Sequence, residues 1–481
     1  MPDNGTIIRV LKNGGCKLLL EKYVGNKAFL KKVFALTFPI MLQNGITNLV
    51  SLVDNIMVGT LGTEQMSAVA IVNQLLFVFN LAIFGIVSGV GIFTAQYFGK
   101  GDNDGIKKTV RLKFLTVAII LVISIGVLVF AGSELINAYL HESDQNLNLD
   151  IAFEQAKKYL TIMLIGLVPF ALSQVYSSTL RETEQPMIPL ISGICAVVVN
   201  LVFNYFLILG KCGFPKLGVS GAAIATVLAR FVEAAVICVF FHTNKEKCPF
   251  SKGLFKGFYI PLSLVKRILP KAIPLMANEA CWSLGIALLN YCYALRGLDV
   301  VAATNICSTI SNLFIVSLIG FGSSISIMVG GLLGANKIEE AKDVNVKLTV
   351  QSFIISVVLA LVMYYTSGLY PEIYHTTPYV KQLAKAFIMC YAIYLPLHSL
   401  MNSFYFAIRS GGKTLMTFLF DSGYMFVITV PFAYVLARFT GFDVVTVYMA
   451  SLLIEIFKVI VGFVLVKNGF WARNIVDVKD D

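Results

Sequence analysis

Long apolar runs alternate with short polar segments along almost the whole chain. The polar segments are rich in Gly, Pro, Asn and charged residues, which end helices or lie in loops. A helix needs about 20 apolar residues to cross about 30 Å of hydrocarbon. Runs of that length predict twelve transmembrane helices, at residues 33–58, 66–97, 111–138, 153–180, 187–209, 219–242, 266–295, 302–333, 347–369, 380–408, 415–437 and 445–466.

The composition excludes a soluble protein. Of the 481 residues, 57% are hydrophobic and only 14% are charged, and the mean hydropathy is +0.79. Soluble chains carry about 25% charged residues, and this chain lacks the charge to coat a water-exposed surface. The apolar residues must therefore face lipid, and we expect a multi-pass protein of the plasma membrane.

The basic residues predict an orientation. A net charge of +11 would indicate a nucleic-acid partner in a soluble protein, but here Lys and Arg lie mainly in the loops between apolar runs. With the N-terminus in the cytoplasm, 28 of the 38 basic residues fall on the cytoplasmic side. The positive-inside rule then predicts that both termini are cytoplasmic, with no nucleic acid bound. Eight basic residues fall on the opposite side: Lys157, Lys158, Lys211, Lys216, Arg296, Lys381, Lys385 and Arg438.

The longest basic loop divides the chain near its middle and prompts a search for an internal repeat. Shifting the sequence by 235 residues aligns Pro39 with Pro274 and Gly85 with Gly320, and other helix breakers and loop charges also align. Six helices per half predict an all-α membrane protein of two pseudo-symmetric six-helix bundles, related by an axis along the membrane normal. The substrate path would lie between the halves. The predicted divisions are a cytoplasmic leader (1–32), a first bundle (33–242), a linker (243–265), a second bundle (266–467) and a cytoplasmic tail (468–481).

Neither a signal peptide nor a cysteine framework is predicted. The first thirty or so residues carry lysines but no compact apolar core with a cleavage site, which is typical of a cytoplasmic leader. None of the cysteines lies in a CxxC spacing, and most fall within apolar runs, so neither disulfides nor a zinc site are expected. The nine cysteines are Cys16, Cys195, Cys212, Cys238, Cys248, Cys281, Cys292, Cys307 and Cys390.

Ionisable side chains at membrane depth are costly, so each is a functional candidate. Asp54 lies near the outer end of the first helix, on a polar stripe with Asn44, Thr47 and Ser51 at helical spacing. A carboxylate there can exchange a proton or hold Na⁺, whereas the alternative is an interfacial acid that only accepts structural hydrogen bonds. We take Asp54 as a cation-coupling residue and Asn44 and Ser51 as substrate contacts, together with Gln174 of the fourth helix.

Glu279 in the seventh helix is a second candidate for cation coupling. The repeat pairs it with Asn44 and pairs Asp54 with Leu289, so the halves agree in helix breakers but not in buried charge. Such an asymmetry suits a site that couples one ion to one substrate. The alternative is a carboxylate that the helix dipole stabilises.

Amide and aromatic side chains extend the candidate sites. Asn200 and Asn204 lie one turn apart in the fifth helix, and their carbonyls can coordinate Na⁺, although hydrogen bonding between helices explains them equally well. In the tenth helix an aromatic face with a titratable His suits a flat or cationic ligand, and packing is the alternative. That face holds Tyr391, Tyr394, His398, Asn402 and Tyr405, of which the first four are taken as substrate contacts.

Two further charge pairs favour a structural interpretation. Arg230 and Glu233, like Glu455 and Lys458, are spaced i, i+3 and occupy nearly equivalent repeat positions with the signs reversed. This spacing predicts intrahelical ion pairs that lower the cost of membrane insertion. Asp421 in the eleventh helix could be an anchor or part of a site.

With twelve helices and a parallel repeat, the chain resembles the multidrug and toxic compound extrusion family over nearly its whole length. The resemblance rests on the segments FPIMLQNGITNLVSLVDNIMVGTLG, FGIVSGVGIFTAQYFGKGD, NLVFNYFLILGKCGFPKLGVSGAAIATVLAR, NEACWSLG, IRSGGKT and WARNI. It implies export of drugs or organic cations in exchange for H⁺ or Na⁺, by alternating between inward- and outward-open states. No other cofactor is implied.

The same resemblance suggests roles for single residues. Asp54 matches the family's acidic residue of the first helix, Asn204 falls where some relatives carry a second aspartate, and Glu279 resembles the acid of the seventh helix. His398 falls near an aspartate of the sodium-linked branch, and Lys413 stands where a GGDT-like turn usually has Asp. These two departures argue against the family's usual sodium site in the second half, and leave Asp54 with Asn204 as the possible Na⁺ position.

Other functions fit the sequence less well. A flippase for a lipid-linked saccharide or cell-wall precursor would need cationic residues for a pyrophosphate, and few lie within the helices. An enzyme would need a cluster of His, Asp or Cys, but the four histidines are dispersed. A channel would usually be a symmetric oligomer, whereas this long pseudo-symmetric chain is expected to be a monomer. The sequence leaves the substrate and the choice between H⁺ and Na⁺ open.

Overall fold

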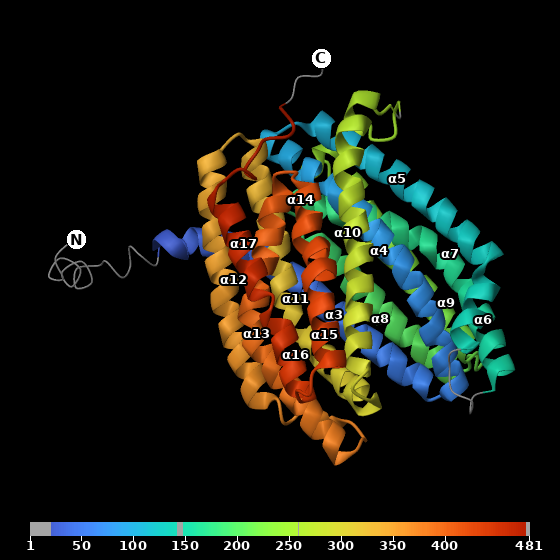
Figure 1. Cartoon of the computed structure of the whole chain (residues 1–481). Helices are drawn as coiled ribbons and strands as arrows, with labels where there is room; N and C mark the ends of the chain where they lie inside the picture. Colours follow the sequence, from blue (N-terminus) through green and yellow to red (C-terminus); the bar gives the residue numbers. More distant parts are fainter. Residues whose placement is uncertain (1–20, 142–147, 258, 478–481) are drawn as a thin grey trace, which may run out of the picture. The chain divides into compact units, whose positions relative to one another are not determined.

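The computed structural model describes residues 21–141, 148–257 and 259–477. Within these ranges the secondary structure is helical and contains no strand (Figure 1). Twelve helices are long and apolar enough to cross a membrane, which confirms the predicted all-α fold with twelve transmembrane segments. Cys16, most of the predicted leader and the last four residues of the predicted tail lie outside the described residues.

The first six membrane-spanning helices precede the central linker. They are α3 (Lys27–Gly59), α4 (Thr63–Lys100), α5 (Asn103–Phe130), α7 (Leu149–Glu182), α8 (Met187–Leu209) and α9 (Val219–Thr243), with a short α6 (Gly132–His141) after α5.

The next six spans follow the linker, and the last two of them are interrupted. They are α10 (Leu262–Ala294), α11 (Leu298–Gly334), α12 (Ile338–Thr366), α13 (Pro378–Ser410), the series α14 (Thr414–Phe418), η4 (Leu419–Gly423), η5 (Met425–Thr429) and α15 (Val430–Phe439), and the pair α16 (Val444–Leu453) and α17 (Ile456–Lys467). Short 3₁₀ turns occur at Pro249–Ser251 (η2) and Pro371–Ile373 (η3).

The third span differs clearly from the sequence prediction. Helix α5 occupies Asn103–Phe130, whereas the apolar run predicted 111–138. Asp102 sets its start, because the Asp102 side chain accepts a 2.8 Å hydrogen bond from the Gly105 N–H and so caps the helix. The first turns of α5 are polar in sequence but partly buried by packing, so hydropathy alone placed the start too late.

The helices form two compact units. Among the described residues, unit 1 consists of 21–41 and 281–477, and unit 2 consists of 42–280. Helices α3 and α10 therefore each contribute to both units. The boundary between the units therefore does not coincide with the sequence division at 243–265.

The same helix neighbours recur in the two units. In unit 2, α4 packs against α5 and α7, and α7 also packs against α9. In unit 1, α11 packs against α12 and α13, and α13 also packs against α17. These helices are equivalent in the predicted repeat, and the agreement supports two pseudo-symmetric bundles.

Close contacts fix the shared helices within their units. In unit 2, a side chain at Gly89 of α4 would place its Cβ 2.6 Å from the Cα of Ala272 in α10, so only glycine permits this approach. In unit 1, the hydroxyls of Thr37 in α3 and Ser324 in α11 are hydrogen-bonded at 2.7 Å.

The linker between the two sequence halves is docked on unit 2. Its side chains Phe250 and Leu254 are buried. Arg111 of α5 donates hydrogen bonds to four linker carbonyls, which a guanidinium can do because it carries five N–H donors in a fixed fork. The acceptors are the carbonyls of Leu254 (2.7 Å), Lys256 (3.0 Å), Gly253 (3.1 Å) and Tyr259 (3.2 Å).

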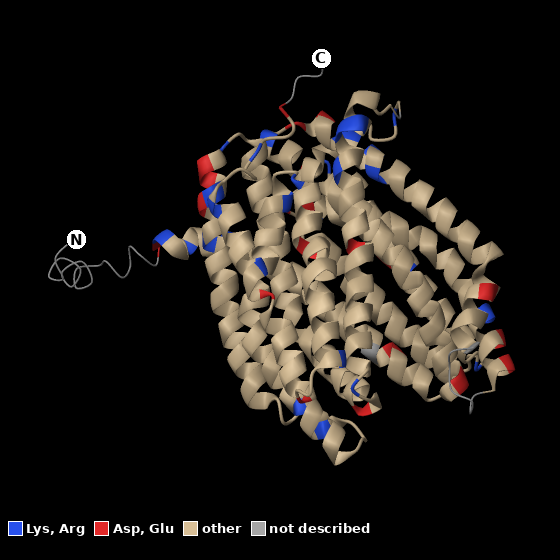
Figure 2. Ribbon diagram, viewed as in Figure 1, with Lys and Arg blue, Asp and Glu red and all other residues tan. Residues whose placement is uncertain are grey.

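Most charged residues lie at helix ends and in loops, and the middle parts of the helices carry few of them (Figure 2). This distribution is expected where helices cross hydrocarbon. The few charged groups inside the spans are therefore the places to look for a site.

Candidate functional site

A chain of polar side chains links three helices of unit 2. Asn204 of α8 donates a 2.6 Å hydrogen bond from Nδ2 to the Oδ1 of Asp54 in α3, and a second of 3.1 Å to the Oδ1 of Asn200. Asn200 donates in turn to the hydroxyl of Thr226 in α9 at 3.4 Å. Asn200 and Asn204 are buried, whereas Asp54 is half-buried. Three of the four predicted cation-coupling residues are thus brought together.

This arrangement offers oxygen ligands to a cation. The Oδ1 of Asn204 is buried and has no hydrogen-bond partner, while the Nδ2 of the same amide donates to the Asp54 carboxylate. Buried polar atoms are normally paired, so an unpaired acceptor here is notable. Carboxylate and amide oxygens are the ligands that hard cations prefer, and the Asp54 carboxylate can equally take a proton. The residues present therefore fit either H⁺ or Na⁺.

The remaining predicted polar residues of unit 2 lie on α3, α7 and α10. The Ser51 hydroxyl donates to the Thr47 carbonyl of its own helix at 3.1 Å, and its side chain is exposed. Asn44 and Gln174 are half-buried. Glu279 is half-buried on α10, next to the buried Asn278.

The predicted ion pair between Arg230 and Glu233 does not form, and this prediction is corrected. Arg230 instead donates to the Gly166 carbonyl of α7 at 3.4 Å and lies over the Phe170 ring, 4.9 Å from its centroid. The physical reason is that Gly166 has no side chain, which leaves room for the guanidinium against α7.

Unit 1 brings together the aromatic face predicted for the tenth helix, now α13. The Tyr391 hydroxyl and the Nδ1 of His398 are hydrogen-bonded at 3.1 Å, and the ring centroids of Tyr394 and His398 lie 5.5 Å apart. Asn402 is half-buried, and its Nδ2 donates to the Leu318 carbonyl of α11 at 2.7 Å.

The second predicted ion pair, between Glu455 and Lys458, forms at 3.8 Å, but Lys458 has a nearer partner that the sequence did not identify. Lys458 of α17 lies 2.8 Å from Asp421 Oδ1 in η4, and the sequence neighbour Glu455 is farther, at 3.8 Å. The reason is geometric: spacing along one helix identifies Glu455, but the side chain of Lys458 reaches across to the interrupted eleventh span.

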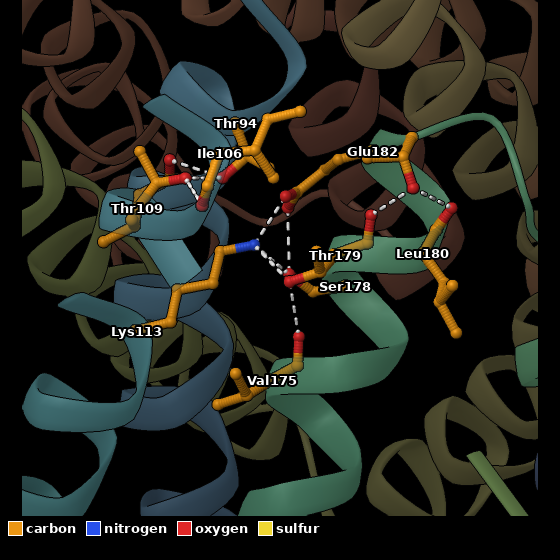
Figure 3. Close-up of polar contacts among 11 residues, drawn as sticks. Thr94, Ile106, Thr109, Lys113, Val175, Ser178, Thr179, Leu180 and Glu182 are labelled. Atoms are coloured by element: carbon orange, nitrogen blue, oxygen red, sulfur yellow. Dashed lines mark hydrogen bonds and ion pairs between the residues drawn. The ribbon is translucent and has the colours of Figure 1, made fainter. Parts of the chain in front are cut away.

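One buried charge pair was missed in the sequence. Lys113 of α5 is fully buried and lies 2.5 Å from Glu182 Oε2 in α7; it also donates to the Ser178 hydroxyl at 2.6 Å (Figure 3). Lys113 lies inside the predicted span 111–138, but it was counted with the basic residues of the cytoplasmic side and was given no partner. The fourth span was predicted to end at residue 180, whereas α7 continues to Glu182, so the sequence offered no partner within a helix for Lys113. The complete pairing of Lys113 makes this cluster structural.

Comparison with known proteins supports a transport protein. The MatE family model matches residues 39–206 and 274–435, two segments that begin 235 residues apart, as the repeat does. A probable multidrug resistance protein NorM of Thermotoga maritima is 24% identical over 460 residues, covering 94% of this chain and 95% of the relative. A probable multidrug resistance protein YoeA of Bacillus subtilis is 24% identical over 413 residues, covering 85% and 88%.

Solved structures agree on the fold. A crystal structure of MATE in complex with MaD3S superposes with a TM-score of 0.82 at 18% identity, covering 93% of this chain and 97% of the other. A crystal structure of a mutant of the Vibrio cholerae MATE transporter VcmN gives a TM-score of 0.81 at 19% identity, covering 93% and 98%.

Proposed function

Because the chain belongs to the MatE family and is a multi-pass membrane transporter, we propose that it is a cation-coupled antiporter that exports drugs or organic cations from the cytoplasm. The coupling cation is H⁺ or Na⁺, and export proceeds by alternating access. The single observation that carries this proposal is the 2.6 Å hydrogen bond between Asn204 and Asp54 in unit 2, next to the unpaired Oδ1 of Asn204. The names of the multidrug relatives support the substrate class.

The arrival of a cation changes the contact between α3 and α8. A charged carboxylate is a strong acceptor for the Asn204 amide N–H, and a protonated one is weaker. Na⁺ at Asp54 would instead favour the Oδ1 of Asn204, which requires the amide to turn. In both cases the bond that joins Asp54 to Asn204 is weakened or broken. We propose that this releases α3 and drives the change between inward- and outward-open states.

The energy available is sufficient for export. One monovalent cation that enters down a potential of about 100 mV supplies about 2.3 kcal/mol. Since about 1.4 kcal/mol corresponds to a tenfold change in an equilibrium constant, one cation supports a substrate gradient of a few tens-fold.

The charge distribution supports the orientation proposed for this function. Placing both termini in the cytoplasm puts most Lys and Arg on the cytoplasmic side of the plasma membrane, in accord with the positive-inside rule. Export of a cationic or aromatic small molecule by a monomer needs no cofactor besides the coupling ion.

Efflux from proteoliposomes under separately imposed proton and sodium gradients tests the proposal. We expect one gradient to drive export of a fluorescent organic cation, and Asp54→Asn to abolish this dependence. Asp299→Asn, an exposed aspartate at the start of α11, is the matched control and should keep wild-type efflux. Wild-type rates in a folded Asp54→Asn protein would contradict the proposal. A protein that responds to neither gradient would instead favour a lipid-linked precursor flippase.

A further inference from the structure

We propose that Lys458 is a resident cation of unit 1: its ammonium group occupies the space between Asp421 and Glu455 that an exchangeable metal ion would otherwise take. This inference rests on the proposed cation coupling and deepens it. Unit 1 then carries no exchangeable Na⁺, and coupling is left to Asp54 in unit 2.

Two carboxylates and two aromatic rings surround the ammonium group of Lys458. Lys458 Nζ lies 2.8 Å from Asp421 Oδ1 and 3.8 Å from Glu455 Oε2, and the side chains of Lys458 and Glu455 are buried. The same Nζ lies over the rings of Phe420 and Tyr424, at 5.5 and 5.9 Å from their centroids. Carboxylates and aromatic faces around one point are the groups that hold a monovalent cation.

Both membrane spans that supply these acids are interrupted. Asp421 lies in the π-helical segment η4, and Glu455 lies in the turn between α16 and α17. The Tyr424 hydroxyl donates to the Ile454 carbonyl of this turn at 2.7 Å. Interrupted membrane helices and π-helical turns are typical of ion and substrate sites. The interrupted backbone is thus of the kind that forms cation sites, and here the cation that it surrounds is the ammonium group of Lys458.

Glu455 is held in place by uncharged donors. Thr429 of η5 donates to its Oε1 at 3.2 Å, and Tyr394 of α13 donates to its Oε2 at 3.4 Å. Both carboxylates are thus directed at one region, and a second cation entering there would be repelled by the ammonium group of Lys458.

The acid of unit 2, Asp54, differs from those of unit 1 because no cationic side chain accompanies it within the described residues. Asp54 has an amide as its hydrogen-bond partner, and within the described residues no Lys or Arg forms an ion pair with it. Arg230, in a nearly equivalent repeat position to Glu455, is directed at Gly166 and Phe170. Asp54 therefore keeps its charge available for an external cation, whereas the acids of unit 1 already share one.

The test measures thermal unfolding of the purified full-length protein in NaCl and in choline chloride, at constant pH and ionic strength. A ligand that binds only the folded state raises the unfolding temperature as its concentration increases. All variants carry Asp54→Asn, which removes the proposed site of unit 2 from the readout. We expect the Asp54→Asn protein to show no Na⁺-dependent rise, and the further variant Lys458→Ala to gain one. Adding Asp421→Asn should remove the gain.

Lys458→Arg and Lys381→Ala are the matched controls. Lys458→Arg keeps the charge and should show no Na⁺ response. Lys381→Ala breaks another ion pair of the same unit, in which Lys381 Nζ lies 2.7 Å from Glu372 Oε2. This variant should also show no Na⁺ response. If Lys458→Ala does not fold, Lys458→Gln takes its place, and direct binding of radioactive ²²Na⁺ to the Asp54→Asn protein gives an independent measurement.

Two outcomes would overturn the inference. One is a Na⁺-dependent rise or ²²Na⁺ binding in the Asp54→Asn protein that Asp421→Asn removes, because unit 1 would then exchange a metal ion. The other is a folded Lys458→Ala or Lys458→Gln variant that gains no Na⁺ response. Neither result depends on drug efflux, so a failure of the proposed antiport is recognised separately by the proteoliposome experiment.

Discussion

Asn204 Nδ2 donates a 2.6 Å hydrogen bond to Asp54 Oδ1 and thereby ties α8 to α3 within unit 2. The two residues are 150 positions apart in the sequence. Since the amide also donates to Asn200, Asn204 is the central member of the polar chain, and its removal separates Asp54 from the rest.

Asn204→Ala is expected to reduce gradient-driven efflux by about tenfold or more, because a hydrogen bond to a charged group contributes about 1.5–3 kcal/mol. Initial efflux rates from proteoliposomes measure the effect. Asn305→Ala, an exposed asparagine of α11, is the control and should leave the rate unchanged. An Asn204→Ala protein that folds and exports at the wild-type rate would show that this bond is dispensable for transport.

The Lys113–Glu182 pair predicts strongly non-additive effects on stability. Removing one partner of a buried ion pair leaves an uncompensated charge and destabilises a protein by about 3–5 kcal/mol, whereas replacing both is often nearly neutral. The repeat places Leu348 and Ser410 at the equivalent positions of unit 1. We therefore expect Lys113→Leu and Glu182→Ser each to lower the unfolding temperature markedly, and the double variant to recover most of the loss. Additive losses in the double variant would refute the pairing.

Two cysteines report the membrane orientation and the docked linker. Cys212, after α8, is exposed, and Cys248 in the linker is fully buried. In a variant with Cys212 as its sole cysteine, a membrane-impermeant maleimide should label intact cells, because the proposed orientation places this loop outside. Labelling that appears only in inside-out vesicles would reverse the orientation.

A second variant with Cys248 as its sole cysteine should react slowly with the same maleimide, even in inside-out vesicles, where the proposed orientation exposes the cytoplasmic side to the reagent. Burial raises the pKa of the Cys248 thiol from 9.0 to about 11, and the thiolate is the reactive form. Near neutral pH the thiolate fraction is then about a hundredfold lower than for an ordinary thiol, and burial also limits access. Arg111→Ala should speed the reaction by loosening the linker, whereas Lys107→Ala, which removes only a local pair with Asp104, should not.

Asp443 makes the stability of α16 depend on pH. Hydrogen bonds from the Thr446 hydroxyl and N–H and from the Val445 N–H hold the pKa of the Asp443 carboxyl below its usual 3.8. A pKa that is lower in the folded state means that this stabilisation is complete above the usual pKa and is lost as the pH falls through the lowered value.

Asp443→Ala is accordingly expected to lower the free energy of unfolding by about 1 kcal/mol at neutral pH, as for other helix caps. The difference in unfolding temperature from wild type should shrink once the pH is below the lowered pKa. A difference that stays constant over this pH range would mean that the carboxylate charge does not contribute to the cap.

Hydropathy predicted the spans well because a helix in lipid must be apolar over its whole crossing. It failed at the start of α5, where the cap at Asp102 places the polar residues before position 111 inside the helix. Periodicity along single helices identified Asp54 and Asn204 as candidates, but their contact depends on how α3 and α8 pack. The same limit explains why Lys458 was assigned to Glu455: spacing along one helix carries no information about the π-helical turn that presents Asp421.

The docked linker has a consequence for biosynthesis. Unit 2 is complete only when it includes the linker that Arg111 holds and the part of α10 that packs on Gly89. A ribosome must therefore translate about 280 residues, well past the sixth span, before this unit can reach its native packing. A gene fragment that stops after α9 would leave the α4 glycines and the linker-binding surface uncovered. We expect such a half-length product to be degraded in the cell, whereas a fragment that continues through Ala280 contains every described segment of the unit.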